Sequence, residues 1–232
     1  IKNTEKGKFV YGRKIEKGQL TRISLSSIIP NVLKTLQGPR FMKWGEGNMK
    51  FSRPIRWITS IYNDEVLDFA FNECDPNIQV SNKSRSHRLI NEVFEVQNPN
   101  NYFELMRENR VLVNRDERKE KIESLINHAS KALNLNADLS EELLNELTDL
   151  VEWPELIIGK FSEEFLDLPF EVLSTVMKSH QRYVPLTLKN NTFSKLDLSS
   201  EKNISTNFFV ISNGLKESNN NIAKGNEKVL RA

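Results

Sequence analysis

Two prolines, Pro154 and Pro169, divide the most informative part of this sequence, residues 150–183, into segments of defined character. Proline interrupts a helix from within but is favoured in a helix's first turn. Pro154 follows a helical pattern and Pro169 opens another. The stretch is therefore predicted to run from a helix through a strand into a second helix. Composition alone would indicate no more than a soluble globular domain.

The second half of the chain carries two amphipathic helical patterns. Apolar residues recur at helical spacing over residues 116–133 and 140–151. Asp138 and Glu141 have capping-box spacing before the second pattern. A helix is also predicted from Pro169 to about residue 181. Strand-like runs cover residues 156–161, 183–188 and 207–212, and the polar segment 190–207 is predicted to be an exposed loop.

The first half of the chain is less regular. Helical spacing covers residues 25–36, with Pro30 inside it at a kink or a first turn, and a glycine-punctuated loop follows at residues 40–47. Two strand-rich runs separated by Asn63–Glu65 predict a β-hairpin. These two runs are residues 55–62 and 66–71, and further strand-like segments of this half are residues 9–11 and 93–96.

These elements alternate without a regular βαβ rhythm, which favours an α+β fold. We expect mixed, mostly antiparallel sheets with packed amphipathic helices. The predicted organisation is an α+β subdomain with a hairpin and basic loops over residues 1–115, and a helix-rich α+β subdomain over residues 116–232.

Length and composition bound the function. A chain of 232 residues can form one large domain or two small ones, and its net charge of +2 does not by itself indicate a nucleic-acid partner. Cys74 is the one cysteine, so no internal disulfide can form, which fits a cytoplasmic protein. No apolar run is long enough to span a bilayer. Ile1 is not a natural start and a helical pattern is cut at residue 232, so we expect a piece of a longer chain.

Several kinds of catalytic centre are excluded. His87, His128 and His180 are scattered without ligand-spaced partners, and no phosphate-binding glycine loop or nucleophile elbow occurs. Acidic pairs such as Glu141–Glu142 lie in polar stretches that are typical of a solvated face. We therefore predict no catalytic residue and no metal site in this chain.

Three local basic clusters are candidates for RNA contact. Cations interleaved with aromatic rings can hold phosphates and stack on bases, whereas the alternative is that they pair with nearby carboxylates. The first cluster also contains Phe41, Trp44, Phe51 and Trp57. The three sets are Arg40, Lys43, Lys50, Arg53 and Arg56; Lys83, Arg85, His87 and Arg88; and Arg107, Arg110, Arg115, Arg118, Lys119 and Lys121.

The helix predicted after Pro169 places His180 on the same face as Val172, Val176 and other apolar residues. We interpret His180 as a core or interface histidine, and Lys178 and Arg182, on the opposite side, as available to a partner or RNA. Trp153 precedes a proline and is predicted to be extended and to cover the core. The full set of predicted structural or interface residues is Trp44, Trp57, His87, Trp153 and His180.

Several ordered blocks resemble one family, the β-subunit of bacterial glycyl-tRNA synthetase. The resemblance covers residues 18–232 approximately, although Ser86 stands where the family usually has Gly and Val184 where it often has Phe. The matching blocks are residues 40–45 (RFMKWG), 51–57 (FSRPIRW), 86–88 (SHR), 147–154 (LTDLVEWP), 165–173 (FLDLPFEVL), 177–183 (MKSHQRY) and 225–232 (GNEKVLRA).

The resemblance implies an α2β2 enzyme, a glycine–tRNA ligase, that joins glycine to tRNA(Gly) with ATP in the cytoplasm. The α-subunit would form the adenylate and this chain would contribute to tRNA recognition and assembly, without a cofactor of its own. The family's HD-type and anticodon-binding domains are absent here, and fold analogy links the chain to B3/B4-type modules. The predicted tRNA-binding residues are Arg40, Lys43, Arg53, Arg56, Arg85, Arg88, Lys178 and Arg182.

Two other functions remain open from the sequence. One is an editing-type deacylase module, which is disfavoured because glycine's larger competitors can be excluded by size at the activation site. The other is a purely structural scaffold for the α-subunit.

Overall fold

The computed structural model of the chain describes residues 2–5, 7–10, 12, 14–15, 17–189, 204–215, 225–227 and 229. The chain divides into two compact units. Unit 1 comprises Ile1–Ser84 with Gln97–Pro99, and unit 2 comprises Arg85–Val96 with Asn100–Ala232. The division falls earlier in the sequence than the predicted boundary after residue 115. The reason is that α2 (Tyr102–Glu108) and the loop after it bond to unit 2, for example from the Leu112 N–H to the Glu152 carbonyl at 2.9 Å.

Unit 1 combines one long helix with short antiparallel hairpins. The helix, α1 (Thr21–Thr35), retains Pro30 inside it and begins four residues before the predicted start. The hairpin predicted around Asn63 is confirmed, with strands shorter than predicted, and Asn63 adopts a left-handed conformation in its turn. The paired strands are β1 (Lys2–Thr4) with β2 (Gly7–Phe9), β3 (Met42–Lys43) with β4 (Lys50–Phe51), β5 (Ile61–Tyr62) with β6 (Glu65–Val66), and β7 (Ala70–Phe71) with β8 (Ile78–Gln79).

The core of unit 1 is small and lies among these hairpins. Helix α1 has no buried residue of its own and contributes partly buried side chains along one stripe, Leu25, Ile29 and Leu33. The buried residues form two neighbouring clusters, Met49, Phe71 and Ile78 in one, and Leu67, Phe69 and Val80 in the other.

The glycines of the loop at residues 40–47 allow a close approach of two backbone segments. Gly45 has φ +63°, and a Cβ on Gly47 would lie 2.5 Å from the Glu73 carbonyl oxygen. The Glu46 N–H donates to Asp75 Oδ2 at 2.9 Å. The Gly-x-Gly sequence is therefore a packed turn, as its composition predicts.

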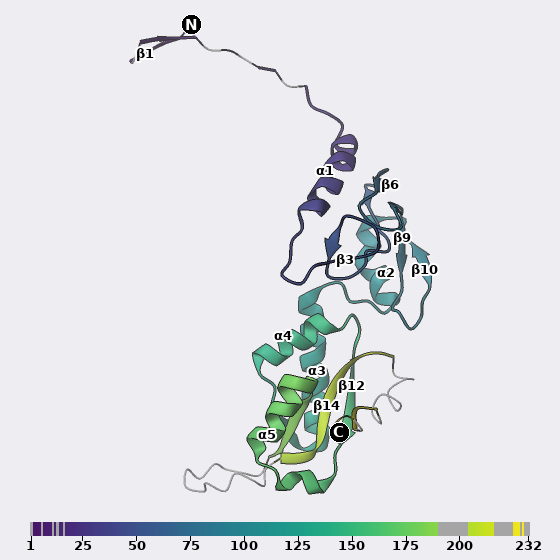
Figure 1. Ribbon diagram of the computed structural model, residues 1–232, viewed down its shortest axis with the longest axis vertical. Helices are drawn as coiled ribbons and strands as arrows, with labels where there is room; N and C mark the ends of the chain where they lie inside the picture. The colour runs from purple at the N-terminus through teal and green to yellow at the C-terminus, as the bar shows by residue number, and fades with distance from the viewer. Residues whose placement is uncertain are drawn as a thin grey trace. The chain divides into compact units, whose positions relative to one another are not determined.

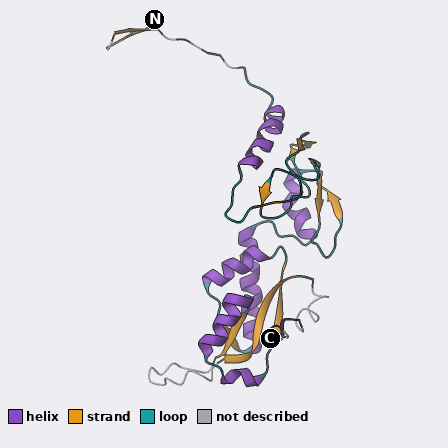
Figure 2. Ribbon diagram, viewed as in Figure 1, coloured by secondary structure: helices purple, strands orange, loops and turns teal. Residues whose placement is uncertain are grey.

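Unit 2 is built on a four-stranded antiparallel sheet with the order β11-β13-β14-β12. Figure 1 labels the neighbouring strands β12 and β14. The strand β9 (Lys83–Arg85) contains the boundary between the units, and β10 (Val93–Glu95) precedes α2. Helices and strands alternate through the remainder of the unit (Figure 2). In order they are α3 (Arg115–Leu133), β11 (Leu135–Ala137), α4 (Glu141–Leu150), β12 (Pro154–Lys160), a 3-10 helix (Glu163–Asp167), α5 (Phe170–Thr175), a π-helix (Val176–Gln181), β13 (Val184–Leu188) and β14 (Ile204–Asn213).

Polar side chains cap the N-termini of the two long helices of unit 2, α3 and α4. Asn114 Oδ1 accepts from the N–H groups of Asp116 and Glu117, at 2.9 and 3.3 Å, and caps α3. The Ser140 hydroxyl accepts from the Leu143 N–H at 3.2 Å and caps α4. The capping box predicted at Asp138 is therefore wrong, because the serine two residues later is better placed to reach a free N–H of the first turn.

Each face of the sheet in unit 2 carries its own apolar core, because successive residues of β14 point to opposite sides. One face packs against α3 and α4, and the other packs against α5 and the π-helix. The first core contains Ile122, Ile126, Leu135, Leu143, Leu144, Leu147, Val151, Val184, Leu186, Phe209 and Ile211; the second contains Ile157, Phe161, Leu173, Met177, Tyr183, Ile204, Phe208 and Val210.

The helix after Pro169 begins where predicted but changes type at Val176. The buried positions of this segment are Leu173 and Met177, four residues apart, whereas Val172, in α5 before the type changes, already lies on the exposed side. His180 is exposed, and so are Val172 and Val176, while Met177 is buried. Of the two alternatives predicted for His180, the core position is therefore wrong, and a position at an interface stays a prediction.

Some predictions fall partly outside the described residues. Tyr11 of the first strand-like run is one of these. Of the loop predicted over residues 190–207, residues 190–203 lie outside the described ranges, and the remainder belongs to β14. The last predicted helix is helical at residues 225–227 and 229, and its other positions are not described.

Candidate nucleic-acid interface

The first basic cluster is an exposed surface of unit 1. Its five cations, which we call the unit-1 cations, are all exposed, and no ion pair joins them to a carboxylate of the described residues. They lie on the hairpin of β3 and β4 and on the segments that flank it. The set is Arg40, Lys43, Lys50, Arg53 and Arg56.

Lys43 and Lys50 are direct cross-strand partners in this hairpin. Like charges in this position repel each other and destabilise the pairing. An anion bound between them would relieve that repulsion. The hairpin thus holds two adjacent positive charges that no carboxylate of the described residues neutralises.

The aromatic residues beside the unit-1 cations differ in their roles. Trp44 is half-buried and its Nε1–H donates to the Phe51 carbonyl at 2.9 Å, while the Phe41 and Phe51 rings lie 4.9 Å apart. Trp57 is 37% exposed, and the Arg56 guanidinium lies 5.3 Å from its ring centre. Trp44 therefore fixes the hairpin, and Trp57 is the ring accessible to a base.

The second basic cluster does not form one surface. Arg88 is exposed and Arg85 is half-buried. His87 is completely buried.

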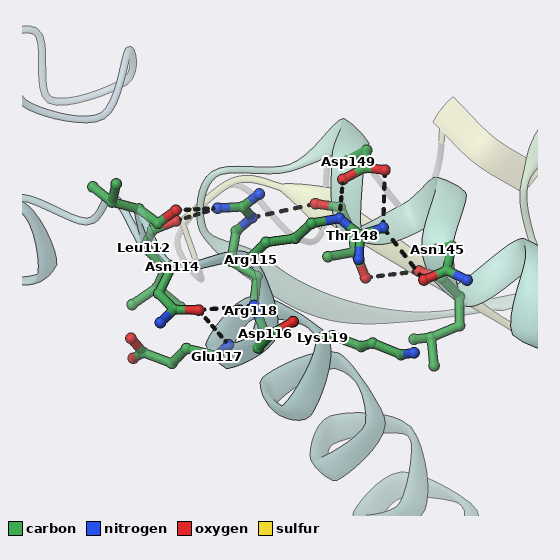
Figure 3. Close-up of polar contacts among 12 residues, drawn as sticks. Leu112, Asn114, Arg115, Asp116, Glu117, Arg118, Lys119, Asn145, Thr148 and Asp149 are labelled. Carbon is green, nitrogen blue, oxygen red and sulfur yellow. Dashed lines mark hydrogen bonds and ion pairs between the residues drawn. The ribbon is translucent and has the colours of Figure 1, made fainter. Parts of the chain in front are cut away.

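The cations at the start of α3 are occupied by partners within unit 2 (Figure 3). Arg115 holds Asp149 with two hydrogen bonds of 2.7 and 3.0 Å, and Lys119 pairs with Glu141. Arg118 donates to the carbonyl groups of Leu112, Val113 and Thr148. The alternative interpretation of this cluster, pairing with nearby carboxylates, describes Arg115 and Lys119, whereas Arg118 bonds to backbone carbonyl groups instead.

These ion pairs also lower the pKa of both carboxyl groups. The hydrogen bond from Arg115 is the largest cause of the shift at Asp149, and the hydrogen bond from Lys119 is the largest cause at Glu141. Both pairs are exposed, so they fix local geometry more than they contribute to stability.

Lys178 and Arg182 likewise have acidic partners. Lys178 pairs with Asp138, and Arg182 Nε donates to Glu146 Oε2 at 2.9 Å. Arg182 has φ 58° at the end of the π-helix and also bonds to the Ser179 carbonyl. Their charges are thus partly neutralised at the junction of the π-helix with α4.

A hydrogen-bonded centre in unit 2 joins segments that are far apart in the sequence. Asn213 Oδ1, at the end of β14, accepts from the N–H groups of Glu152 and Trp153, at 3.0 and 3.1 Å. His87 Nε2 lies 3.1 Å from the same oxygen, and His87 Nδ1 accepts from the Leu89 N–H at 3.4 Å. These bonds require a neutral His87 with its proton on Nε2.

Sequence reasoning missed Asn213. The available signal was an asparagine that ends an apolar strand immediately before Gly214. Its three partners come from the blocks at residues 86–88 and 147–154. Asn213 therefore links two motifs whose proximity the sequence did not reveal.

A cleft of about 550 Å³ lies beside this centre, in unit 2. The Trp153 indole forms part of its wall and donates from Nε1 to Glu155 Oε1 at 3.1 Å. Lys121 Nζ and the Arg110 guanidinium lie 3.5 and 4.9 Å from the centre of that ring. The remaining lining residues are aliphatic, Ile90, Leu125 and Leu215.

Within the described ranges, no three side chains of His, Cys, Asp or Glu converge as a metal ion would require. None of the described helices has the length and apolar character needed to cross a bilayer.

Comparison with known proteins matches the whole chain to a single family. The family profile described as glycyl-tRNA synthetase beta subunit matches residues 1–232. Three relatives, each named glycine–tRNA ligase beta subunit, align over the full chain: 41% identical in Trichodesmium erythraeum, 34% in Acaryochloris marina and 35% in Synechocystis sp.. The chain spans 32%, 31% and 31% of these relatives respectively, about a third of their length.

Proposed function

The chain belongs to the glycyl-tRNA synthetase beta subunit family, and from this premise we propose that it forms part of a glycine–tRNA ligase that charges tRNA(Gly). In this proposal the protein is cytoplasmic and assembles with an α-subunit as an α2β2 tetramer. The α-subunit uses ATP to form glycyl-adenylate, and this chain contributes to tRNA recognition and assembly.

The unit-1 cations are the part of this chain that we assign to tRNA contact. The observation that carries the assignment is the cross-strand pair of Lys43 and Lys50, two exposed like charges without a carboxylate partner in the described part of the chain. A tRNA phosphate between them would supply the missing counter-charge. Arg53 and Arg56 extend the surface, and Trp57 offers a ring for stacking.

Arg88 is a further candidate for tRNA contact, because it is exposed. Lys178 and Arg182 are weaker candidates, since a phosphate would have to compete with Asp138 and Glu146. We therefore assign these two cations to the packing of the π-helix against its neighbours.

The test measures tRNA(Gly) binding by the full-length β-subunit in complex with its α-subunit. Replacing Lys43 and Lys50 by Gln removes two charges from the hairpin. We expect the slope of log affinity against log salt to become shallower by roughly one for each phosphate that the hairpin no longer neutralises. The matched control is Lys119→Gln with Lys178→Gln, which removes two cations that are already ion-paired. Equal changes of slope in both variants would contradict the assignment.

The division of chemistry between the subunits has its own test. Because we assign adenylate formation to the α-subunit, the full-length β-subunit alone should catalyse no ATP–pyrophosphate exchange with glycine. Exchange activity that is retained after complete removal of the α-subunit would refute this part of the proposal. Loss of tetramer assembly without loss of tRNA binding would instead favour a scaffold role.

A further inference from the structure

The cleft beside Trp153 is built from five segments of unit 2. Ile90 comes from the turn after His87, Arg110 from the end of α2, and Lys121 and Leu125 from α3. Trp153 and Glu155 come from the start of β12, and Leu215 follows β14. Sites where several elements converge on one concave surface are typical of ligand binding, and about 550 Å³ is within the usual range for a small organic ligand.

The indole of Trp153 is held rigidly in this cleft. Its backbone N–H bonds to Asn213, its Nε1–H bonds to Glu155, and Pro154 restricts the backbone that follows. A side chain that is held at its ring by one bond and at its backbone by two constraints needs little ordering when a ligand arrives, so binding costs less conformational entropy.

Arg110 occupies a backbone conformation that an arginine does not favour. It has φ 60°, in the left-handed region, one residue beyond the C-cap of α2, where glycine is the preferred residue. Its exposed guanidinium lies over the Trp153 ring, and none of the described carboxylates forms an ion pair with it. A residue retained against backbone strain at a cleft is an indication of function.

The charges that line the cleft favour an anion. Two of the lining side chains are cations, Arg110 and Lys121, and one is an acid, Glu155. The aliphatic lining residues would remain in contact with water if the ligand were a small inorganic anion. A ligand with both an anionic group and a flat apolar part satisfies both sides of the cleft.

We propose that this cleft binds one nucleoside monophosphate unit, either a free nucleotide or an unpaired nucleotide of an RNA. The phosphate is bound by Arg110 and Lys121 through charge-assisted hydrogen bonds. The base packs against Leu125 and Leu215, and Glu155 accepts from a ribose hydroxyl or an exocyclic amine. The site is separate from the unit-1 cations, so it does not rest on their assignment to tRNA.

The experiment is equilibrium dialysis of labelled AMP against the full-length β-subunit. We expect Arg110→Gly to bind AMP roughly tenfold more weakly, because a charge-assisted bond to the phosphate is removed. The same variant should unfold at a temperature no lower than the wild type, since glycine suits the left-handed position. Arg107→Gln is the matched control on α2, because Arg107 is paired with Glu117.

A second variant, Lys121→Gln, tests the site independently of the backbone at residue 110 and should also weaken AMP binding. If both variants bound AMP as tightly as the wild type does, the proposal would be overturned. So would binding of inorganic phosphate as tight as that of AMP, or displacement of AMP by glycine. A single-stranded trinucleotide that binds more tightly than AMP identifies RNA as the source of the nucleotide, and the reverse order identifies a free nucleotide; either order supports the proposal.

Discussion

The ring of Phe208 lies directly over Gly159, its cross-strand partner in the pairing of β12 with β14. A Cβ on Gly159 would lie 2.3 Å from Phe208 Cζ. Phe208 is completely buried and stacks on Tyr183, with ring centres 4.9 Å apart. The ring therefore cannot move aside. The second core of unit 2 can pack in this way only with glycine at position 159.

Gly159→Ala is consequently expected to destabilise unit 2 strongly. Overpacking of a rigid core costs about 1–3 kcal/mol, and the contact here is with a ring held by aromatic neighbours. The measurement is urea unfolding followed by far-UV circular dichroism. Gly18→Ala is the control, because a Cβ there meets nothing within 4 Å, and it should change stability by no more than about 0.5 kcal/mol. Equal effects of the two substitutions would contradict the role assigned to Phe208.

Asn213 is half-buried, and Asn213→Leu should destabilise the chain more than a substitution at a half-buried position usually does. The substitution keeps the shape but leaves the N–H groups of Glu152 and Trp153 and the ring N–H of buried His87 without their acceptor. Of these three residues only His87 is buried, and a buried donor that loses its partner costs about 1–3 kcal/mol. The same unfolding assay measures the loss. Asn207→Leu, on the same strand, is the control, because its side chain makes no hydrogen bond to the described residues. A loss at residue 213 no larger than at residue 207 would show that the shared acceptor contributes little.

The ion pair of Arg115 with Asp149 predicts a pH dependence of stability in the acid range. The pKa of Asp149 is lower in the folded chain, so the folded state binds its proton less readily than the unfolded state. The stabilisation is present above the unfolded-state pKa and is lost as the pH falls through the lowered folded-state value. Unfolding midpoints measured from pH 7 to pH 2 should therefore fall less steeply for Asp149→Asn than for the wild type. Parallel curves would show that the pair does not contribute.

Cys74 should react slowly with thiol reagents. Burial, and after it the negative charge of Glu73, raise the pKa of its thiol, which reduces the fraction of reactive thiolate at neutral pH. Alkylation by iodoacetamide at pH 7.5, followed by mass spectrometry of the peptide that contains Cys74, should be slower in the folded than in the unfolded chain. Glu73→Gln should speed the reaction in the folded state, and an unchanged rate would leave burial as the cause.

The sequence was most informative where one periodicity continued without interruption. Helices α3 and α4 follow the predicted ranges closely, since apolar spacing of 3.6 residues persists through both. The α+β class and the family followed from the same patterns and blocks. His180 was not correctly placed because apolar residues occupy two adjacent rows of this segment; Leu173 and Met177 are the buried row, while Val172, Val176 and His180 are exposed.

The site was only partly predictable because its chemistry depends on long-range partners. The cations of the first and third clusters look alike in the sequence. They differ in the structure because Asp149 and Glu141, on α4, reach Arg115 and Lys119, while no described carboxylate reaches Lys43 or Lys50. Asn213 and the Trp153 cleft depend in the same way on partners more than 60 residues apart in the sequence, for example the 61 that separate Glu152 from Asn213.

The order of strands in unit 2 has a consequence for synthesis on the ribosome. β14 lies inside the sheet between β12 and β13, yet it is the last of the four strands to be translated. Until residue 213 has left the exit tunnel, β12 has no partner and the apolar faces of α3, α4 and the π-helix lack the strand that joins them. The nascent chain carries these surfaces exposed from the synthesis of α3 until β14 emerges, and we expect unit 2 to form cooperatively, in a single event, once β14 arrives.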